Sequence, residues 1–491
     1  MKEFDVAIIG GGINGCGIAR DAAGRGLSVL LVEQGDLASG TSSYSSKLIH
    51  GGIRYLENYD FSLVRESLRE RELLLENAPH LVRPMRFVIP HVASMRPAWM
   101  IRIGIKLYDF LAGGSVLPRS KVLDLRNDPA GEPLNGNSTT GFQYSDCITD
   151  DARLVIANAI DARERGADIR PRTRLVSARR VEKRWQLEIE RGGSRETLFA
   201  RALVNAAGPW AANVIDTLIE GAAPVKLRLV KGSHVVYPRL YPDERAYVLQ
   251  SDDRRIVFVV PFGEKYTLIG TTDVEISGDP GQASASAEEI QYLCRLAGQF
   301  FKTEIEPSRV VWTFAGVRPL IDSEGSASRA TREYQIVSDG GNNDAPLLSL
   351  IGGKLTAFRS MSEDVVNRLG RSFAMRPAWT ANEPLPGGDL DARGIEGLLS
   401  DIKLRHSYLP DPMLRRIAAA YGSQAMNMLG DAKKLEDLGP RLAGDLHARE
   451  LDYLRRYEWA AAPDDVLFRR TKLGVGAATA EIEAVKAAFA G

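Results

Sequence analysis

A glycine-rich turn near the N-terminus constrains the fold more than any other part of the sequence. Two apolar segments rich in β-branched residues, FDVAIIG and LSVLLVE, flank the motif Gly10-x-Gly12-x-x-Gly15, which opens a stretch with helical spacing. This order of strand, turn, helix and strand binds a pyrophosphate at the helix N-terminus. An acid at the end of the second strand, here Glu33, binds the ribose. The sequence therefore predicts a Rossmann-type dinucleotide-binding unit.

Three later segments favour FAD over NAD as the dinucleotide. The hydroxyl-rich run from Thr41 to Ser46 follows the second strand, where it could contact phosphates and flavin. LVNAAGPWA ends a strand in a small-residue turn, and IGGKLTAF places two glycines before a helix whose N-terminus could stabilise reduced flavin. The residues predicted to contact FAD are Gly10, Gly12, Ile13, Asn14, Gly15, Glu33, Gln34, Thr41, Ser42, Ser43, Ser45, Ser46, Lys47, Leu48, Val176, Ala206, Gly208, Gly352, Gly353, Lys354, Leu355 and Thr356.

The order of elements predicts an α/β protein whose FAD-binding domain is interrupted by other parts. From about residue 225 to 345 the pattern indicates mostly antiparallel strands, and the chain beyond about 385 is helical and polar. The predicted boundaries are 1–75, 146–225 and 336–384 for the three parts of the FAD-binding domain, 76–145 for a substrate- and membrane-facing segment, 226–335 for an inserted substrate-binding β domain and 385–491 for a C-terminal helical cap.

Composition excludes several classes of function. The chain has 491 residues, and its 63 Lys and Arg balance 63 Asp and Glu, so we expect no nucleic-acid partner. Cys16, Cys147 and Cys294 lie far apart and fit no metal-ligand spacing, so we predict reduced thiols and no metal. No apolar run approaches the roughly 20 residues that span a bilayer. These features predict a cytoplasmic protein.

Seven motifs carry a resemblance to a known family. They are SSKLIHGGIRYLE, FQYSDCITDDARLV, VNAAGPW, KGSHVV, IGTTDVE, GVRPL and GGKLTAFR. From residue 5 to about 385 the chain resembles the FAD-dependent glycerol-3-phosphate dehydrogenases, respiratory enzymes of the D-amino acid oxidase and glycine oxidase fold group. The resemblance implies oxidation of sn-glycerol 3-phosphate to dihydroxyacetone phosphate by hydride transfer to flavin N5. It also implies that the electrons pass to membrane ubiquinone.

Oxidation of an alcohol by flavin requires a base for the hydroxyl proton, and two histidines are candidates. His50 lies in a glycine-flanked loop beside the predicted flavin site, and His234 lies in the KGSH motif. The alternative for His50 is a histidine that only hydrogen-bonds to the flavin or to the backbone. We predict His50 as the base and keep His234 as the second candidate.

A phosphate substrate requires cations, and arginine binds phosphate with two donors at once. Arg54, Arg318 and Arg332 match substrate-pocket positions of the family, although a solvated surface charge is the alternative for each. The further predicted substrate contacts are Tyr55, Thr271 and Lys354. A cation near the flavin would also favour the reduced anionic form, so catalytic roles are predicted for Arg318 and Lys354 as well as for the two histidines.

Residues 96–111, RPAWMIRIGIKLYDFL, combine apolar and aromatic residues with cations. An in-plane interfacial helix requires this combination, because it inserts apolar side chains and attracts anionic lipids. The residues predicted to face the membrane are Arg96, Trp99, Met100, Arg102 and Lys106. The alternatives are a core helix with snorkelling cations and a dimer contact. Together with the quinone acceptor, this segment predicts peripheral binding at the cytoplasmic face of the inner membrane.

Two rival activities remain at this point. A soluble oxidase of the same substrate would reduce oxygen to peroxide, and the basic aromatic segment speaks against it. A flavin amine or amino acid oxidase would need one arginine for a carboxylate, whereas several cations are predicted here. A non-enzymatic flavoprotein scaffold is disfavoured because the base and cation positions are all filled.

Overall fold

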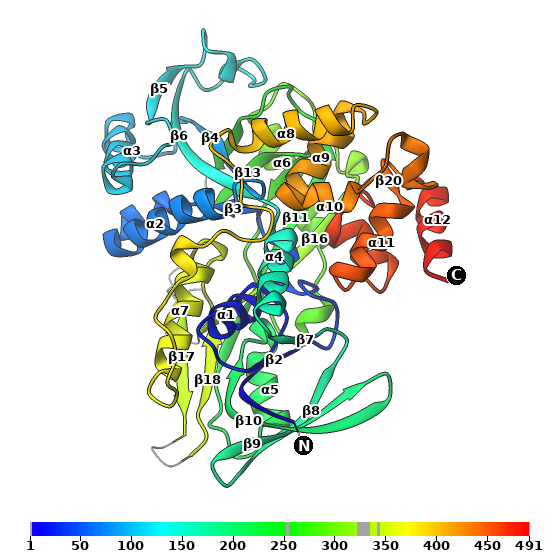
Figure 1. Ribbon diagram of the computed structural model, residues 1–491. Coiled ribbons are helices and arrows are strands. Elements are labelled where there is room, and N and C mark those ends of the chain that lie inside the picture. The colour runs from blue at the N-terminus through cyan, green and yellow to red at the C-terminus, as the bar shows by residue number, and fades with distance from the viewer. Residues whose placement is uncertain (1, 252–254, 322–333, 341–343, 491) are drawn as a thin grey trace.

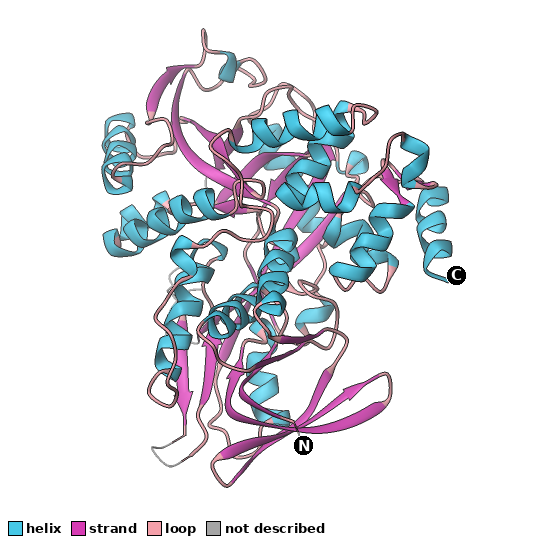
Figure 2. Ribbon diagram, viewed as in Figure 1, coloured by secondary structure: helices cyan, strands magenta, loops and turns pink. Residues whose placement is uncertain are grey.

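The computed structural model describes residues 2–251, 255–321, 334–340 and 344–490. It has two large sheets and a C-terminal helical region with a small two-stranded sheet, so the predicted fold class is confirmed (Figures 1 and 2). In the view of Figure 1, the sheet that contains the N-terminal strand lies below, the second sheet lies above, and the C-terminal helices lie to the right.

The first sheet is mainly parallel, as the glycine motif predicts. Its strand order is β17-β18-β10-β1-β2-β7, and the antiparallel hairpin of β8 and β9 extends from β10. The hairpin turn between β9 and β10 contains Gly192 and Gly193, both with positive φ. The strands are β1 (Glu3–Ile9), β2 (Val29–Val32), β7 (Asp168–Arg170), β8 (Arg174–Val181), β9 (Arg184–Arg191), β10 (Ser194–Asn205), β17 (Gln335–Asp339) and β18 (Leu347–Ile351).

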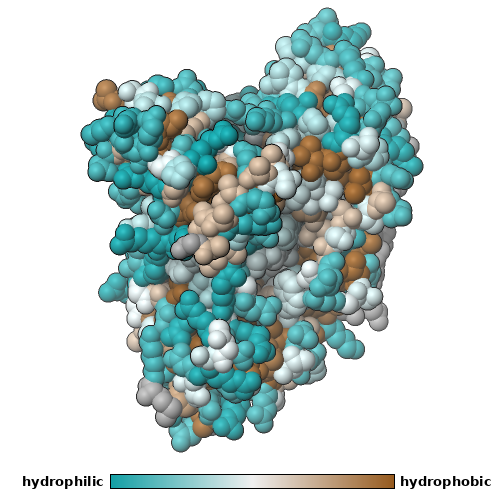
Figure 3. Space-filling model, turned by 90° about the vertical axis from the view of Figure 1, so that its right-hand side faces the viewer, coloured by the Kyte–Doolittle hydropathy of each residue, from teal (hydrophilic) through white to brown (hydrophobic). Residues whose placement is uncertain are grey.

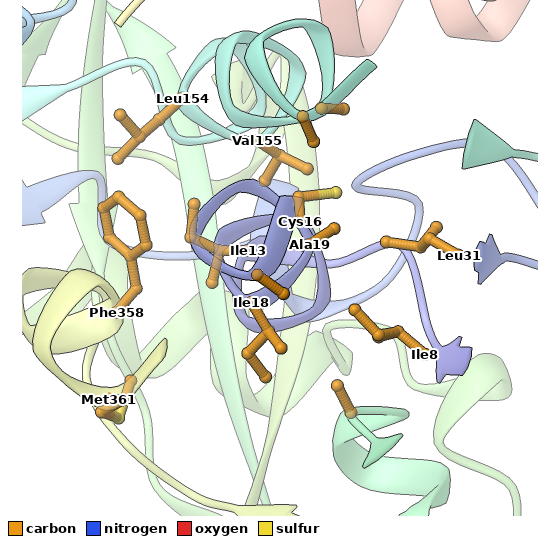
Figure 4. Close-up of a cluster of buried hydrophobic side chains, with 14 of the residues drawn as sticks. Ile8, Ile13, Cys16, Ile18, Ala19, Leu31, Leu154, Val155, Phe358 and Met361 are labelled. Carbon is orange, nitrogen blue, oxygen red and sulfur yellow. The ribbon is translucent and has the colours of Figure 1, made fainter. Parts of the chain in front are cut away.

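Helix α1 (Ile13–Gly24) is the centre of the core on one face of this sheet. Figure 4 shows it surrounded by side chains of the sheet and of two further helices, α4 (Asp151–Glu164) and α7 (Phe358–Leu369). Ile18 on α1 is fully buried, and burial of one such side chain contributes about 1.5–3 kcal/mol. This packing fixes the start of α1 relative to the carboxyl end of β1.

The second sheet combines the predicted β region with earlier parts of the chain. Its order is β15-β11-β14-β13-β12-β4-β6-β3, with β16 paired to β11 and β5 paired to β6. All these pairs are antiparallel except β12 with β4. The strands are β3 (Leu48–Ile49), β4 (Val82–Pro90), β5 (Lys121–Asp124), β6 (Thr140–Thr149), β11 (Leu227–Pro238), β12 (Ala246–Gln250), β13 (Ile256–Phe262), β14 (Tyr266–Gly270), β15 (Val274–Ile276) and β16 (Trp312–Ile321).

The remaining helices cover the sheets or form the C-terminal region. They are α2 (Phe61–Asn77), α3 (Ala98–Ala112), α5 (Ala211–Leu218), α6 (Ala287–Gly298), α8 (Gly394–Arg405), α9 (Asp411–Tyr421), α10 (Ala425–Leu429), α11 (Ala448–Tyr457) and α12 (Thr479–Ala490). The C-terminal region also contains a small hairpin of β19 (Arg441–Ala443) and β20 (Leu446–His447), and it has a hydrophobic core of its own. Within the described ranges, no helix has the length and apolar character needed to span a bilayer.

Candidate active site

A cavity of about 940 Å³ lies where the two sheets meet. One side is formed by the carboxyl ends of β1, β2, β10 and β18 together with the segments that follow them. The other side is formed by β11, β13 and β16 of the second sheet. Ligands of open α/β sheets bind at the carboxyl ends of the strands, so this position is the expected one for a cofactor.

The glycine turn brings backbone so close to backbone that side chains are excluded. A Cβ atom on Gly15 would lie 1.9 Å from the carbonyl oxygen of Gly10, and one on Gly10 would lie 2.6 Å from that of Ala206. Glu33 accepts hydrogen bonds at 2.7 Å from the N–H groups of Gly11 and Gly35. The N-terminus of α1 and the Glu33 carboxylate therefore both border the cavity, and they fit the pyrophosphate and ribose of a dinucleotide.

The hydroxyl-rich segment forms one wall of the cavity, but its hydroxyls also bind the protein. Thr41 donates to the carbonyl oxygen of Val317 at 2.7 Å, and the Ser42 hydroxyl accepts the Ile13 N–H at 3.0 Å. Ser45 donates to the Asp151 carboxylate at 2.7 Å. These bonds tie the segment to α1, α4 and β16, and so they fix the shape of the wall.

The two candidate bases have different surroundings. His234 is buried in β11, stacks on Phe314 with ring centroids 4.8 Å apart, and places Nε2 2.9 Å from the Ser46 hydroxyl. Burial, and then the charges of Arg318 and Lys47, hold the pKa of His234 well below its usual range, so this ring is neutral and a weak base. His50 is only half-buried and also borders the cavity.

A hydrogen-bonded network holds the turn that carries His50. The His50 N–H donates to the Thr356 hydroxyl at 3.0 Å, and the Gly51 N–H donates to the Tyr108 hydroxyl at 2.8 Å. Tyr108 in turn donates to Asp146 at 2.8 Å, and Arg71 forms an ion pair with Asp146 at 2.7 Å. Burial raises the pKa of Asp146 even though Arg71 and Tyr108 oppose the shift. The backbone beside His50 is therefore fixed from two sides.

The predicted cations converge on the same cavity. Lys354 lies over the Tyr55 ring, with Nζ 3.7 Å from the ring centroid, and Arg54 also borders the space. Arg318 Nη1 forms an ion pair with Asp273 Oδ1 at 2.6 Å.

Because Gly232 on β11 has no side chain, the space beside it is occupied by the side chains of Arg318 and Thr271. A Cβ atom there would lie 2.4 Å from the Thr271 hydroxyl and 2.9 Å from Arg318 Nη2. The missing side chain allows Arg318 and Thr271 to approach each other beside the cavity.

Most residues predicted for the site line the cavity. Those that do not, among the described residues, are Gly15, Ser43, Lys47 and Val176. Gly15 packs on the glycine turn, Lys47 forms a buried ion pair with Asp151 at 2.8 Å, and Thr173 to Leu175 line the space in place of Val176. Arg332 lies outside the described residues.

Several lining residues are missing from the prediction. Among them are Tyr144, Asp146, Arg255, Phe258 and Asp273. Tyr144 and Asp146 belong to the motif FQYSDC and Asp273 to IGTTDVE, so the signal for these three is present in the sequence. Phe258 shows only the alternation of a strand, which gives no sign of a site.

Comparison with known proteins gives consistent matches over nearly the whole chain. A family model described as FAD dependent oxidoreductase matches residues 5–359, and one described as the C-terminal domain of alpha-glycerophosphate oxidase matches residues 378–490. Glycerol-3-phosphate dehydrogenase of Pseudomonas aeruginosa is 50% identical over 96% of this chain and 92% of its own length. D-erythritol 1-phosphate dehydrogenase of Brucella abortus is 44% identical over 96% and 94%, respectively.

A solved structure extends this likeness to the fold. The glycerol-3-phosphate dehydrogenase of Bacillus halodurans, complexed with FAD, has a TM-score of 0.78 and 28% identity, and the match covers 97% of this chain and 87% of that one. The fold and the glycine turn thus define an FAD dependent oxidoreductase. Within that class, the chain belongs to the FAD-dependent glycerol-3-phosphate dehydrogenase family, as the resemblance predicts, and FAD is its cofactor.

Proposed function

We propose that the protein oxidises sn-glycerol 3-phosphate to dihydroxyacetone phosphate. The observation that carries this proposal is the convergence of three cationic side chains, Arg54, Arg318 and Lys354, on the cavity that the dinucleotide turn also borders. Such a group of cations suits a dianionic phosphate better than a single carboxylate. The name of the P. aeruginosa relative supports the same substrate.

His50 is the proposed base. It takes the proton of the substrate hydroxyl, and the Thr356 and Tyr108 hydrogen bonds fix the backbone that carries its imidazole. Bound FAD would supply the acceptor for the hydride that leaves the substrate carbon. His234 is a poorer base because its ring is buried near two cations, which disfavour protonation. Its neutral ring instead holds the Ser46 hydroxyl in place.

Arg318 and Arg54 are proposed to bind the phosphate, and Lys354 to complete the charge of the pocket. Arg318 already pairs with Asp273, so a phosphate oxygen would share or replace that carboxylate. Lys354 is held against the Tyr55 ring and lies 3.4 Å from the Ser67 hydroxyl, which limits the positions of its ammonium group. Thr271, beside Arg318, is proposed to contact a substrate hydroxyl.

Membrane ubiquinone is the proposed electron acceptor, and α3 the proposed membrane-facing helix. Trp99, Ile103 and Phe110 on α3 are 62%, 57% and 78% exposed, whereas Ile105 and Tyr108 on its other face are buried. The predicted cations Arg96, Arg102 and Lys106 are also exposed, as is Met100. An exposed apolar face with cations is what binding to an anionic lipid surface requires.

Anaerobic mixing of the FAD-loaded protein with glycerol 3-phosphate tests the proposal. We expect rapid bleaching of the flavin absorbance by glycerol 3-phosphate, and none by glycine or sarcosine. Bleaching by either amine and not by the phosphate would overturn the proposal. Steady-state oxygen uptake with and without a soluble quinone then separates the two acceptors, because an oxidase would turn over at full rate without quinone.

D-erythritol 1-phosphate is a second candidate substrate, because a relative with 44% identity bears that name. The same cations could bind its phosphate, and the two substrates differ in the length of the polyol that follows. The ratio of kcat/KM for the two phosphates, measured in one assay, decides between them. We expect glycerol 3-phosphate to be preferred.

A further inference from the structure

Two segments that border the FAD cavity are held by cations from the far end of the chain. The first segment is 33–36, which contains Glu33 and ends at Asp36. The Asp36 carboxylate is only 3% exposed, and it accepts hydrogen bonds from Arg469 at 2.6 Å and from both Nη atoms of Arg470 at 2.6 and 2.8 Å. Both arginines belong to the π-helical turn Asp465–Arg470 of the C-terminal region.

The same turn also contacts the next part of the cavity wall. Arg172 donates its backbone N–H to the carbonyl oxygen of Gly35 at 2.8 Å, and its guanidinium binds Asp465 at 2.7 Å. The adjacent Thr173 N–H donates to the carbonyl oxygen of Glu33 at 2.8 Å. Segment 33–36 is therefore bound to the C-terminal region both directly and through Arg172.

The second segment is the hydroxyl-rich stretch 41–47. Two ion pairs at the adjacent residues Asp150 and Asp151 connect it to the C-terminal region. Lys472 forms an ion pair with Asp150 at the start of α4. The neighbouring Asp151 binds Lys47 at 2.8 Å and Ser45 at 2.7 Å, and Lys47 also donates to the carbonyl oxygen of Ser43 at 3.0 Å. Burial would raise the pKa of Asp151, but Lys47 and then Lys472 reverse the shift, so this carboxyl stays ionised.

These charges are buried, so each depends on its partners. Asp151 and Arg470 are 0% and 1% exposed. Removal of one partner from a buried ion pair leaves a charge that water cannot solvate, and the surrounding segment must then move to find a new partner. Figure 3 shows the side of the molecule on which the C-terminal helices lie, where hydrophilic areas surround several hydrophobic patches. Asp36, Asp151 and Arg470 lie beneath the surface, because each is almost fully buried.

We infer that residues 465–472 of the C-terminal region position segments 33–36 and 41–47 for FAD, so that this region determines how slowly the flavin is released. Preformed contact segments raise affinity, because ordering them on binding would otherwise oppose it. The inference requires FAD as the cofactor and is independent of the proposed substrate and acceptor. Arg470 and Lys472 are thus positioning residues for the cofactor.

The test is the rate of FAD release from the holoenzyme, followed as the rise in flavin fluorescence after dilution. Arg470→Met and Lys472→Met are each expected to speed release at least tenfold. Substitution of the fully buried Arg470 perturbs folding most, so Arg469→Met is the milder variant. It keeps the ion pair between Arg470 and Asp36 and is expected to speed release about threefold.

Arg416→Met is the matched control. Arg416 forms an ion pair with the buried Glu450 at 2.7 Å inside the same C-terminal region, without touching either segment. Its loss should lower the melting temperature and leave the rate of flavin release unchanged. Unchanged release in the variants of Arg469 and Lys472, or an equal acceleration in Arg416→Met, would overturn the inference, because the C-terminal region would then act only through global stability.

Discussion

The substitution Arg318→Ala gives the sharpest test of the proposed phosphate pocket. Arg318 is 31% exposed and forms an ion pair with Asp273 at 2.6 Å, so its guanidinium is partly desolvated and already oriented. A hydrogen bond to a charged group contributes about 1.5–3 kcal/mol. Partial exposure favours the lower end of that range, so two such bonds to a phosphate contribute about 3 kcal/mol. Since 1.4 kcal/mol is a factor of ten, kcat/KM for glycerol 3-phosphate should fall about 100-fold.

The carboxylate left behind adds to this loss and provides a control. In Arg318→Ala, Asp273 loses this cation and repels the incoming dianion, so Asp273→Asn in the same chain should recover part of the activity. Arg318→Lys keeps the charge without the two-donor geometry and should lose about tenfold.

Anaerobic stopped-flow measurement of flavin reduction at several substrate concentrations gives kcat/KM for each variant, with the flavin absorbance as a check on cofactor content. A change of less than threefold in Arg318→Ala, with the flavin retained, would refute the assignment of Arg318 to the phosphate.

Three other predictions follow from the structure. Gly15→Ala should yield protein without flavin, because its Cβ atom would lie 1.9 Å from a backbone carbonyl oxygen; the ratio of flavin to protein absorbance measures this. Trp99→Ala combined with Phe110→Ala should weaken binding to anionic vesicles at least tenfold in a sedimentation assay, whereas Leu404→Ala, at an even more exposed position on α8, should not. Burial, and then the charge of Arg153, lower the pKa of His80 to about 3, so the unfolded chain binds a proton there below pH 6.5 that the folded chain does not. The free energy of unfolding should therefore fall by up to about 1.4 kcal/mol per pH unit because of His80 as the pH drops below 6.5. In urea unfolding at several pH values, His80→Gln should show a weaker dependence of this free energy on pH.

The parts of the fold that sequence could predict depend on short stretches of chain. The strand, turn and helix around Gly10 and Gly15 follow from local spacing, and the structure forms them as β1 and α1. The amphipathic segments that become α2 and α3 are likewise visible in the residue pattern. Most of the predicted site residues lie around one cavity, and family motifs were needed to predict this. Local spacing alone does not determine which distant segments meet.

The contacts that sequence could not predict join distant charged residues. Asp36 and Arg470 are separated by 434 residues, and an aspartate next to a glycine turn is usually solvated, so nothing in the local pattern marks this pair as buried. The contact of Tyr108 on α3 with Asp146 on β6, which supports the His50 turn, likewise joins distant segments, although Asp146 itself lies in a family motif. Val176 is among the predicted FAD contacts, but Thr173 to Leu175 line the cavity instead, because a strand pattern does not fix which residue of the strand reaches the cavity.

The order of strands in the first sheet has a consequence for synthesis of the chain. β10 lies between β1 and β18, and the lining of the cavity ends with Thr356. A ribosome-bound chain therefore lacks β18, and with it part of the flavin site, until that residue has left the exit tunnel. During this interval Leu203, Val204 and Asn205 of β10 lack their β18 partners, whereas residues 194–200 are already paired with β9. FAD can stabilise the native sheet only after most of the protein has been made, so the early stages of folding must proceed without its cofactor.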